Sequence, residues 1–156
     1  MKREKRVVGW REWVHLPEFG VRMIKAKIDT GARTSSLHAF DIEYVTRGSK
    51  RMVRFKIHPK QRTARGEVEV LAPLLEERKV RSSNGVEEIR PVVWTLVDIG
   101  GECWPIELTL TRRDVMGFRM LVGRQGLRGH AIVDPGRSFL TRKLKRKPGP
   151  RGRKSS

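Results

Sequence analysis

The chain has 156 residues, of which 37% are hydrophobic and 33% are charged, and it carries a formal net charge of +18. This length predicts a single domain, and a charge of this sign favours polyanionic partners such as nucleic acid, a ribosome surface or an acidic protein segment. The single Cys103 excludes an intrachain disulfide framework and a zinc cluster built from cysteines. No apolar run approaches the roughly 20 residues of a membrane span, and no signal peptide pattern opens the chain. We therefore expect a cytoplasmic protein without membrane contact.

Much of the positive charge lies at the two ends of the chain. Residues 1–6 hold four basic side chains and one acid, and residues 141–156 hold eight basic side chains and no acid. A segment of the second composition cannot bury an apolar face, so we expect residues 141–156 to form a disordered basic tail. Residues 1–6 are then a basic extension, and residues 7–140 are the folded domain. A basic arm of this kind can bind phosphate backbones, so nucleic acid or the ribosome is a candidate partner.

Short strands separated by turn residues are the main pattern of residues 7–140. Residues 74–80 fit a strand or a helical turn, and residues 138–140 are a candidate edge strand. Many short strands with little helical periodicity predict an all-β barrel or sandwich. The predicted strands lie within residues 7–19, 21–28, 36–45, 52–57, 68–71, 89–99, 104–110 and 131–134.

The strand predicted at residues 21–28 ends in the sequence Asp29-Thr30-Gly31-Ala32. A strand that delivers an aspartate into a tight glycine turn can hold the carboxylate rigidly at the edge of a sheet. Gly31 tolerates backbone conformations that other residues avoid, Thr30 offers a hydroxyl, and Ala32 leaves space. Short Asp/Gly turns are common in β proteins, so this loop indicates a site only if the chain supplies a second element that matches it.

The later run Leu121-Val122-Gly123-Arg124 is that second element. Together the two runs resemble the retropepsin-like aspartic proteases. The closer resemblance, over about residues 7–140, is to the family described as ATP-dependent zinc proteases, which is associated with ATP-grasp glutamate ligases. Its features here are Lys27–Ala39, Arg90–Val93, Glu107–Leu110, Met120–Arg124 and Val133–Pro135.

The resemblance implies a closed β-barrel of the acid protease type with one short helix near its C-terminal end. It implies that Asp29, Thr30 and Gly31 are the catalytic loop of an aspartic endopeptidase. In this family the apolar pair, here Leu121 and Val122, packs under the catalytic loop. The arginine after the glycine, here Arg124, ties the short helix to the body.

The chain contains one such aspartate loop, whereas two-lobed aspartic proteases contain two. Asp98-Ile99-Gly100 and Asp134-Pro135-Gly136 lack the middle hydroxyl residue. One chain therefore supplies half of a site, and we expect a homodimer with one Asp29 from each subunit. Two facing carboxylates cannot both ionise cheaply, so they share a proton. One acts as general base toward water, and the other donates a proton to the peptide carbonyl.

The substrate and the flap are less constrained by the sequence. A glycine-containing hairpin closes over the substrate in retropepsins, and the candidates are the region around Gly48 and the loop of residues 58–66. Basic side chains of the second loop, together with Arg33 beside the aspartate, would suit an acidic, Glu-rich peptide. The loop residues concerned are Lys60, Arg62 and Arg65. The association of the family with glutamate ligases favours the same substrate.

Two alternatives remain open. The first is a basic module that binds nucleic acid or the ribosome and keeps a non-catalytic aspartate loop. The second is a zinc peptidase, as the family name suggests. No His-Glu-x-x-His motif occurs, although folding could bring His38, Cys103 and His130 together. No Gly-x-x-x-x-Gly-Lys-Ser/Thr motif occurs either, so any dependence on ATP would come from a partner. We predict no metal and no cofactor.

Overall fold

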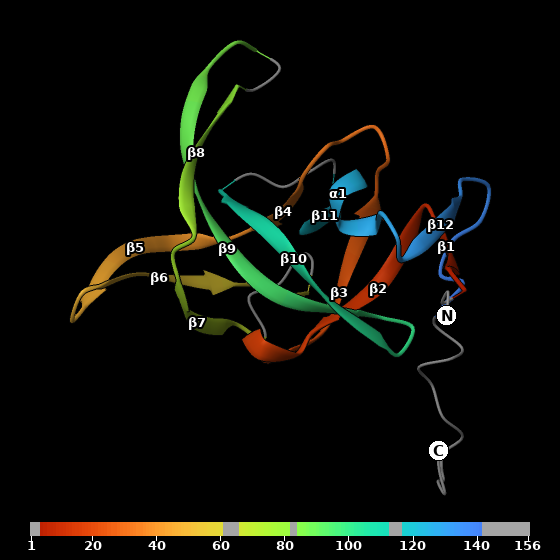
Figure 1. The fold of residues 1–156 in the computed structure, drawn as a ribbon, viewed down its shortest axis with the longest axis horizontal. Helices are drawn as coiled ribbons and strands as arrows, with labels where there is room; N and C mark the ends of the chain where they lie inside the picture. The colour runs from red at the N-terminus through yellow and green to blue at the C-terminus, as the bar shows by residue number, and fades with distance from the viewer. Residues whose placement is uncertain (1–3, 61–65, 82–83, 113–116, 142–156) are drawn as a thin grey trace, which may run out of the picture.

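The computed structural model describes residues 4–60, 66–81, 84–112 and 117–141 (Figure 1). Strands dominate these residues, with one short α-helix near the C-terminal end and one 3₁₀ turn, as the sequence predicted for an all-β protein. The elements in chain order are β1 (Arg6–Gly9), β2 (Arg11–Leu16), η1 (Pro17–Phe19), β3 (Val21–Ile28), β4 (Ser35–His38), β5 (Phe40–Arg47), β6 (Lys50–Ile57), β7 (Val68–Pro73), β8 (Glu76–Arg81), β9 (Glu87–Ile99), β10 (Glu102–Thr111), β11 (Met120–Val122), α1 (Arg124–Leu127) and β12 (Ala131–Asp134).

Six strands close into a barrel, in the order β10-β4-β11-β3-β2-β9, and β9 pairs again with β10. The predicted closed barrel is confirmed. The interior is filled because alternate residues of each strand point inward, as in β2, where burial alternates along Arg11–Leu16. Most inward residues are branched aliphatics, which pack well on a pleated surface. Fully buried members of the core include Val14, Leu16, Ile24, Leu37, Val97, Ile99, Leu108 and Met120.

The segment predicted as one strand over residues 36–45 is two strands in two sheets. β4 belongs to the barrel, whereas β5 pairs with β6 and β7 in a separate antiparallel sheet of three strands. Ala39 lies between them, and its backbone N–H donates to the carbonyl of Thr111 (2.8 Å). Burial alternates without a break from Ser35 to Phe40. The sequence periodicity therefore continues through the change of sheet and cannot reveal it.

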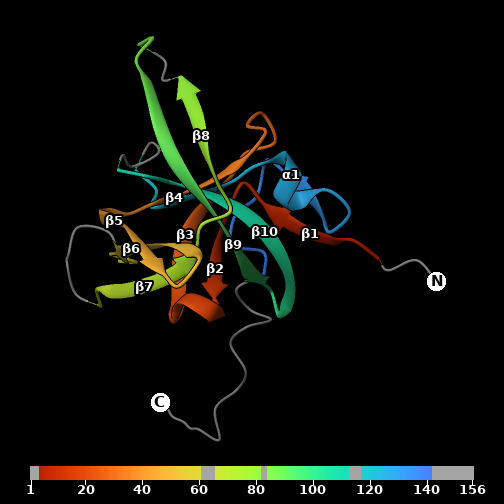
Figure 2. The same ribbon diagram turned by 60° about the vertical axis from the view of Figure 1, so that its left-hand side comes forward.

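Residues 74–80, which fitted a helical turn or a strand, contribute to strand β8. It pairs with the first part of β9 in an antiparallel hairpin, in register from Glu76 opposite Val92 to Arg81 opposite Glu87. Figures 1 and 2 both show this hairpin projecting from the barrel toward the side on which the loop after β3 lies. The second part of β9, residues 92–99, remains in the barrel, where it pairs with β10. A single long strand therefore belongs to both the hairpin and the barrel.

The C-terminal segment after β12 is held by a buried carboxylate. Glu12 of β2 is fully buried, and its two oxygens accept hydrogen bonds from the backbone N–H groups of Gly9 (2.6 Å), Leu140 (2.9 Å) and Thr141 (3.2 Å) and from the Thr141 hydroxyl (2.8 Å). Residues 138–140 form no strand, although the N–H of Phe139 donates to the carbonyl of Arg11. The candidate edge strand is therefore wrong, because side-chain hydrogen bonds to Glu12 replace the ladder.

The ends of the folded part differ slightly from the predicted boundaries. Arg6 is already the first residue of β1, and its partner is Ala131. Thr141 is buried, so it belongs to the body and not to the tail. The rest of the predicted tail, residues 142–156, lies outside the described residues. No helix within the described residues is long and apolar enough to cross a membrane.

Replacing Glu12 should destabilise the fold. In Glu12→Gln, one acceptor oxygen becomes an amide that faces N–H donors. Hydrogen bonds to a charged group contribute roughly 1.5–3 kcal/mol each, so we expect a loss of at least about 2 kcal/mol in the free energy of unfolding. Urea titration measures this loss. Exposed Glu18 provides the control, because Glu18→Gln should change the stability by less than about 0.5 kcal/mol. Equal midpoints for the two variants would contradict the assigned role of Glu12.

Candidate active site

Asp29 lies at the rim of the barrel, directly after β3. Its position is fixed by β11, which runs parallel to β3 with Val122 opposite Ile28. The backbone N–H of Asp29 donates to the carbonyl of Val122 (2.9 Å). On its other edge β11 pairs with β4, so the chain leaves β3, turns through the aspartate loop and returns on the far side of β11. The loop therefore spans a strand that arrives about 90 residues later in the sequence.

The loop itself orients the carboxylate. The N–H of Gly31 donates to Oδ1 of Asp29 (2.9 Å), and the N–H of Ala32 donates to the Asp29 carbonyl (3.2 Å). A Cβ at residue 31 would lie 3.2 Å from Oδ1, so any side chain there would press on the carboxylate. Asp29 is half-buried, while Thr30 and Gly31 are exposed. The carboxylate is thus held by the backbone and remains accessible from the rim.

Gly123 allows the two parts of the site to approach each other. A Cβ at this position would clash with the carbonyl oxygen of Thr34 and would lie 2.9 Å from that of Ala32. The N–H of Gly123 donates to Oγ of Ser35 (3.0 Å), which is buried. Because both neighbours are backbone atoms, no rotamer change can relieve the clash.

Helix α1 is hydrogen-bonded to the aspartate loop. The N–H groups of Arg124 and Gln125 donate to the carbonyls of Ala32 (2.8 Å) and Arg33 (3.0 Å). The guanidinium of Arg124 donates through Nη1 to the carbonyl of Thr30 (2.9 Å). A four-residue helix has little stability of its own, so these contacts and the barrel hold it in place.

Two aromatic residues support the other side of α1. Nε1 of buried Trp104 donates to the carbonyl of Gly126 (2.7 Å). The ring of His130 stacks on Trp104 with a centroid distance of 4.5 Å and an interplanar angle of 5°. Neither residue was predicted to take part. Trp104 follows a turn and precedes a proline in the sequence, and this context gave no sign that its indole would cap α1.

The structure brings together eight of the residues predicted from the sequence. Leu121 and Val122 are buried beneath the loop, and the loop and α1 form one hydrogen-bonded unit. The eight residues are Asp29, Thr30, Gly31, Ala32, Leu121, Val122, Gly123 and Arg124.

The predicted substrate-binding residues do not all lie near Asp29. Arg33 is exposed beside the aspartate loop. Lys60 instead lines a pocket with Val21 and Met23 at the start of β3. That strand has eight residues, so about 25 Å separates its start from Asp29 at roughly 3.3 Å per residue. Lys60 is therefore remote from the carboxylate in this subunit. Arg62 and Arg65 lie outside the described residues.

The hairpin on the Asp29 side is β8–β9, which was not among the two flap candidates. The turn at Gly48 joins β5 to β6 in the three-stranded sheet, away from α1 in Figure 1. The loop of residues 58–66 is described only in part. The sequence does contain a turn signal for the β8–β9 hairpin, because Asn84-Gly85 is a common hairpin turn pair. It marked the turn but not the direction in which the hairpin projects.

The side chains do not form a zinc site in the described part of the chain. No group of three or more His, Cys, Asp or Glu residues could hold a metal ion there. Both ring nitrogens of His38 have partners, the guanidinium of Arg119 (2.8 Å) and the carbonyl of Arg112 (3.0 Å). His130 stacks on Trp104. The convergence of His38, Cys103 and His130 that the sequence left open is not observed.

Comparison with known families identifies the architecture. The family model described as RimB-like, retropepsin-like aspartic endopeptidase RimB, matches residues 7–144. The chain belongs to the RimB-like family. The RimB-like fold also occurs in the crystal structure of Lpg0085, a Legionella pneumophila protein of unknown function. That structure covers 88% of this chain with a TM-score of 0.73 and 25% identity, and 99% of its own length is matched. The RimB-like chain thus has an aspartic protease-like fold.

Curated relatives of this RimB-like chain carry a different name. A probable alpha-L-glutamate ligase of Parasynechococcus marenigrum is 47% identical over 131 residues, which are 84% of this chain and 28% of the relative. A probable alpha-L-glutamate ligase of Shewanella pealeana is 41% identical over 139 residues, which are 89% of this chain and 30% of the relative. The chain therefore spans less than a third of these relatives. The similarity agrees with the association with ATP-grasp glutamate ligases that the resemblance implied.

Gly123→Ala should disrupt the unit that holds Asp29. Its methyl group meets backbone carbonyls of the loop, and overpacking of this kind costs about 1–3 kcal/mol. We expect a lower free energy of unfolding in urea titrations. Gly136→Ala is the matched control, because a Cβ there would have its nearest neighbour at 3.6 Å. A Gly123→Ala protein as stable as Gly136→Ala would show that the close approach is not required.

Proposed function

We propose that the chain is the subunit of a homodimeric aspartic endopeptidase in which Asp29 is the catalytic carboxylate. The observation that carries this proposal is the Asp29 loop, in which the Gly31 N–H orients the carboxylate (2.9 Å) and the Val122 carbonyl fixes its backbone (2.9 Å). Preorganised groups of this kind need not reorganise during a reaction. The family membership supports the same chemistry.

A dimer follows from the single aspartate loop in the sequence. One carboxylate cannot act at once as the base and as the acid of peptide hydrolysis, so the second must come from another subunit. Thr30 is exposed, and its hydroxyl has no hydrogen-bond partner among the described residues. It is available to brace the partner's loop across the two-fold axis.

The ribbon formed by β1 and β12 is the surface that we propose for the dimer. Val7 and Ile132 are opposite each other in this ribbon and are 48% and 54% exposed. Among the described residues the ribbon has two strands, so each of them has one edge without a strand partner there and can pair with another chain. It adjoins the active site, because the carbonyl of Trp10 accepts the N–H of Ile28 next to Asp29. Pairing through this ribbon would place two aspartate loops near one axis.

In the proposed reaction the two Asp29 carboxylates share one proton and hold a water between them. The ionised carboxylate removes a proton from the water as it attacks the peptide carbonyl carbon. The protonated carboxyl donates its proton to the carbonyl oxygen. The tetrahedral intermediate then collapses: one of its hydroxyls returns a proton to the ionised carboxylate, the C–N bond breaks, and the leaving nitrogen takes a proton from the other carboxyl, so that the dyad again holds one proton. The pair titrates as a unit, because each charge depends on the other.

We propose an acidic, Glu-rich peptide as the substrate. The net charge of +18 would attract such a segment, and Arg33 is exposed beside the aspartate loop. Relatives named probable alpha-L-glutamate ligases point to the same chemistry. No step of the proposed reaction involves zinc, because the described donor residues do not fit the metal.

Asp29→Asn should abolish peptide cleavage while it preserves the fold. The amide cannot act as a base, yet it keeps an oxygen for the Gly31 N–H. We expect a loss of at least about a thousandfold in kcat with an acidic fluorogenic peptide, since general base catalysis alone contributes about 10²–10⁴. Circular dichroism and sedimentation should match the parent protein. Cleavage at the parental rate would refute the assignment of Asp29.

Ile132→Glu should separate the subunits and remove activity together. A charge placed on the exposed apolar ribbon would be buried in the dimer without a partner. We expect a monomer by sedimentation velocity and no peptide cleavage. Met23→Glu is the control, because Met23 is an exposed apolar residue at the opposite end of β3. A monomeric Ile132→Glu protein that retains activity would contradict the dimer proposal, and an unchanged dimer would exclude this ribbon as the interface.

A further inference from the structure

A second surface feature lies beside the aspartate loop and is not used by the mechanism. It is a pocket of about 260 Å³ between β4, β9, β10 and α1, with Thr34, Trp94, Pro105, Glu107, Gln125 and Arg128 in its lining. We call it the Trp94 pocket. Its volume is just below the roughly 300–1,000 Å³ typical of small-molecule sites. The size therefore suits one side chain of a longer ligand better than a separate molecule.

The Trp94 pocket is within reach of a peptide bound at Asp29. Thr34 follows Asp29 by five residues, and consecutive Cα atoms are 3.8 Å apart, so their Cα atoms lie at most about 19 Å apart. An extended peptide advances about 3.4 Å per residue. A side chain no more than about six residues from the cleaved bond can therefore enter the pocket.

The pocket combines an apolar wall with a cation. The indole of Trp94 is 49% exposed, which is unusual for a side chain of this size. Pro105 adds to the same wall. Arg128 is exposed, and its guanidinium has no ion-pair partner within the described residues, whereas Arg78 and Arg90 are paired with glutamates. Thr34 and Gln125 supply a hydroxyl and an amide.

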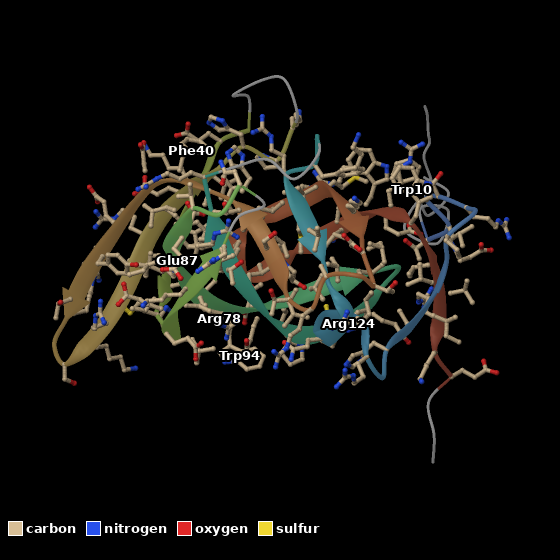
Figure 3. All side chains as sticks on the ribbon, turned by 90° about the horizontal axis from the view of Figure 1, so that it is seen from above. Trp10, Phe40, Arg78, Glu87, Trp94 and Arg124 are labelled. Carbon is tan, nitrogen blue, oxygen red and sulfur yellow. The ribbon has the colours of Figure 1, made fainter. Side chains whose placement is uncertain are left out.

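The pocket's own carboxylate has a cationic partner other than Arg128, which it shares with Glu76. Glu107 accepts a hydrogen bond from Nη2 of Arg78 (3.1 Å), and Arg78 also pairs with Glu76 (2.8 Å). Burial works against the charge of Arg78, but hydrogen bonds to Glu76 and Glu107 outweigh it and raise the pKa of Arg78 above its ordinary value. In Figure 3, Arg78, Trp94 and Arg124 lie toward one side of the molecule, and Phe40 lies toward the other. Of the charged residues that line the pocket, Arg128 is the one without an ion-pair partner in the described part of the chain.

We propose that the Trp94 pocket is a substrate subsite that receives a glutamyl side chain and pairs its carboxylate with Arg128. The proposal rests on the peptidase function proposed above. The aliphatic stem of the glutamate would pack against the indole of Trp94, and the carboxylate would reach the guanidinium, which can donate two parallel hydrogen bonds. The pocket thus selects an acidic residue at one fixed distance from the cleaved bond. It adds a positional preference to the general attraction of a basic protein for acidic peptides.

A double-mutant cycle between protein and peptide tests this pairing. The substrates are an acidic fluorogenic peptide and a series in which each glutamate in turn is replaced by glutamine. For the parent protein, the replacement at one position should lower kcat/KM about tenfold, the effect of one charged hydrogen bond. In Arg128→Gln, the same replacement should change kcat/KM less than about twofold, because the partner charge is already gone.

Arg22→Gln is the matched control. It removes the same charge from an exposed arginine, which lines the pocket at the start of β3. It should keep the parental dependence on the glutamate position and show whether net charge alone explains the effect. The proposal is overturned if no peptide position couples to Arg128, or if Arg22→Gln shows the same coupling.

A binding arm separates this proposal from the peptidase function. The acidic peptide, labelled with a fluorophore, is titrated with Asp29→Asn protein, which is not expected to cleave it. Adding Arg128→Gln should raise Kd about tenfold, and adding Arg22→Gln should raise it much less. If the parent protein cleaves no peptide, the peptidase proposal fails, but the Kd values still show whether Arg128 contributes to binding of the acidic peptide. Equal Kd values for the two double variants would overturn the subsite even if cleavage is observed.

Discussion

The structure depends on the insertion of β11 between β3 and β4. This short strand arrives late in the chain and pairs with both earlier strands. Its last carbonyl accepts the Asp29 N–H, and the following Gly123 lies so close to the loop that a Cβ would clash with Thr34. Closure of the barrel, the conformation of the loop and the orientation of the carboxylate therefore all depend on the position of β11. A chain that fails to place β11 loses all three together.

Arg124 extends that constraint into the short helix. Its guanidinium and its backbone N–H both donate to carbonyls of the aspartate loop, those of Thr30 and Ala32. These hydrogen bonds join the aspartate loop to α1 at the barrel rim. The loop thus obtains its rigidity from β11 and α1, and the exposed side remains open. This arrangement suits the catalytic role that we propose for the carboxylate.

Much of the fold and of the candidate site could be predicted from the sequence, because local patterns of residues indicate them. Alternating apolar residues marked most strands, and the pairing of Asp29-Thr30-Gly31-Ala32 with Leu121-Val122-Gly123-Arg124 marked the site. The change of sheet at Ala39 could not be predicted, since burial alternates straight through it. The role of Glu12 was equally hidden, because its partners Leu140 and Thr141 lie more than 120 residues away. Lys60 was grouped with Arg33 by charge alone, and charge does not say that the two lie at opposite ends of β3.

We propose that each chain carries half of a catalytic site. Mixing parent and Asp29→Asn subunits at a fixed total concentration, after unfolding and refolding together, tests it most directly. If one Asp29 from each subunit is required, activity follows the fraction of dimers with two parent chains, which is roughly a quarter of the parental value in an equal mixture with random pairing. Activity that falls only in proportion to the parent fraction, to roughly half in the same mixture, would show that a single chain is sufficient. That result would contradict a site shared between two subunits.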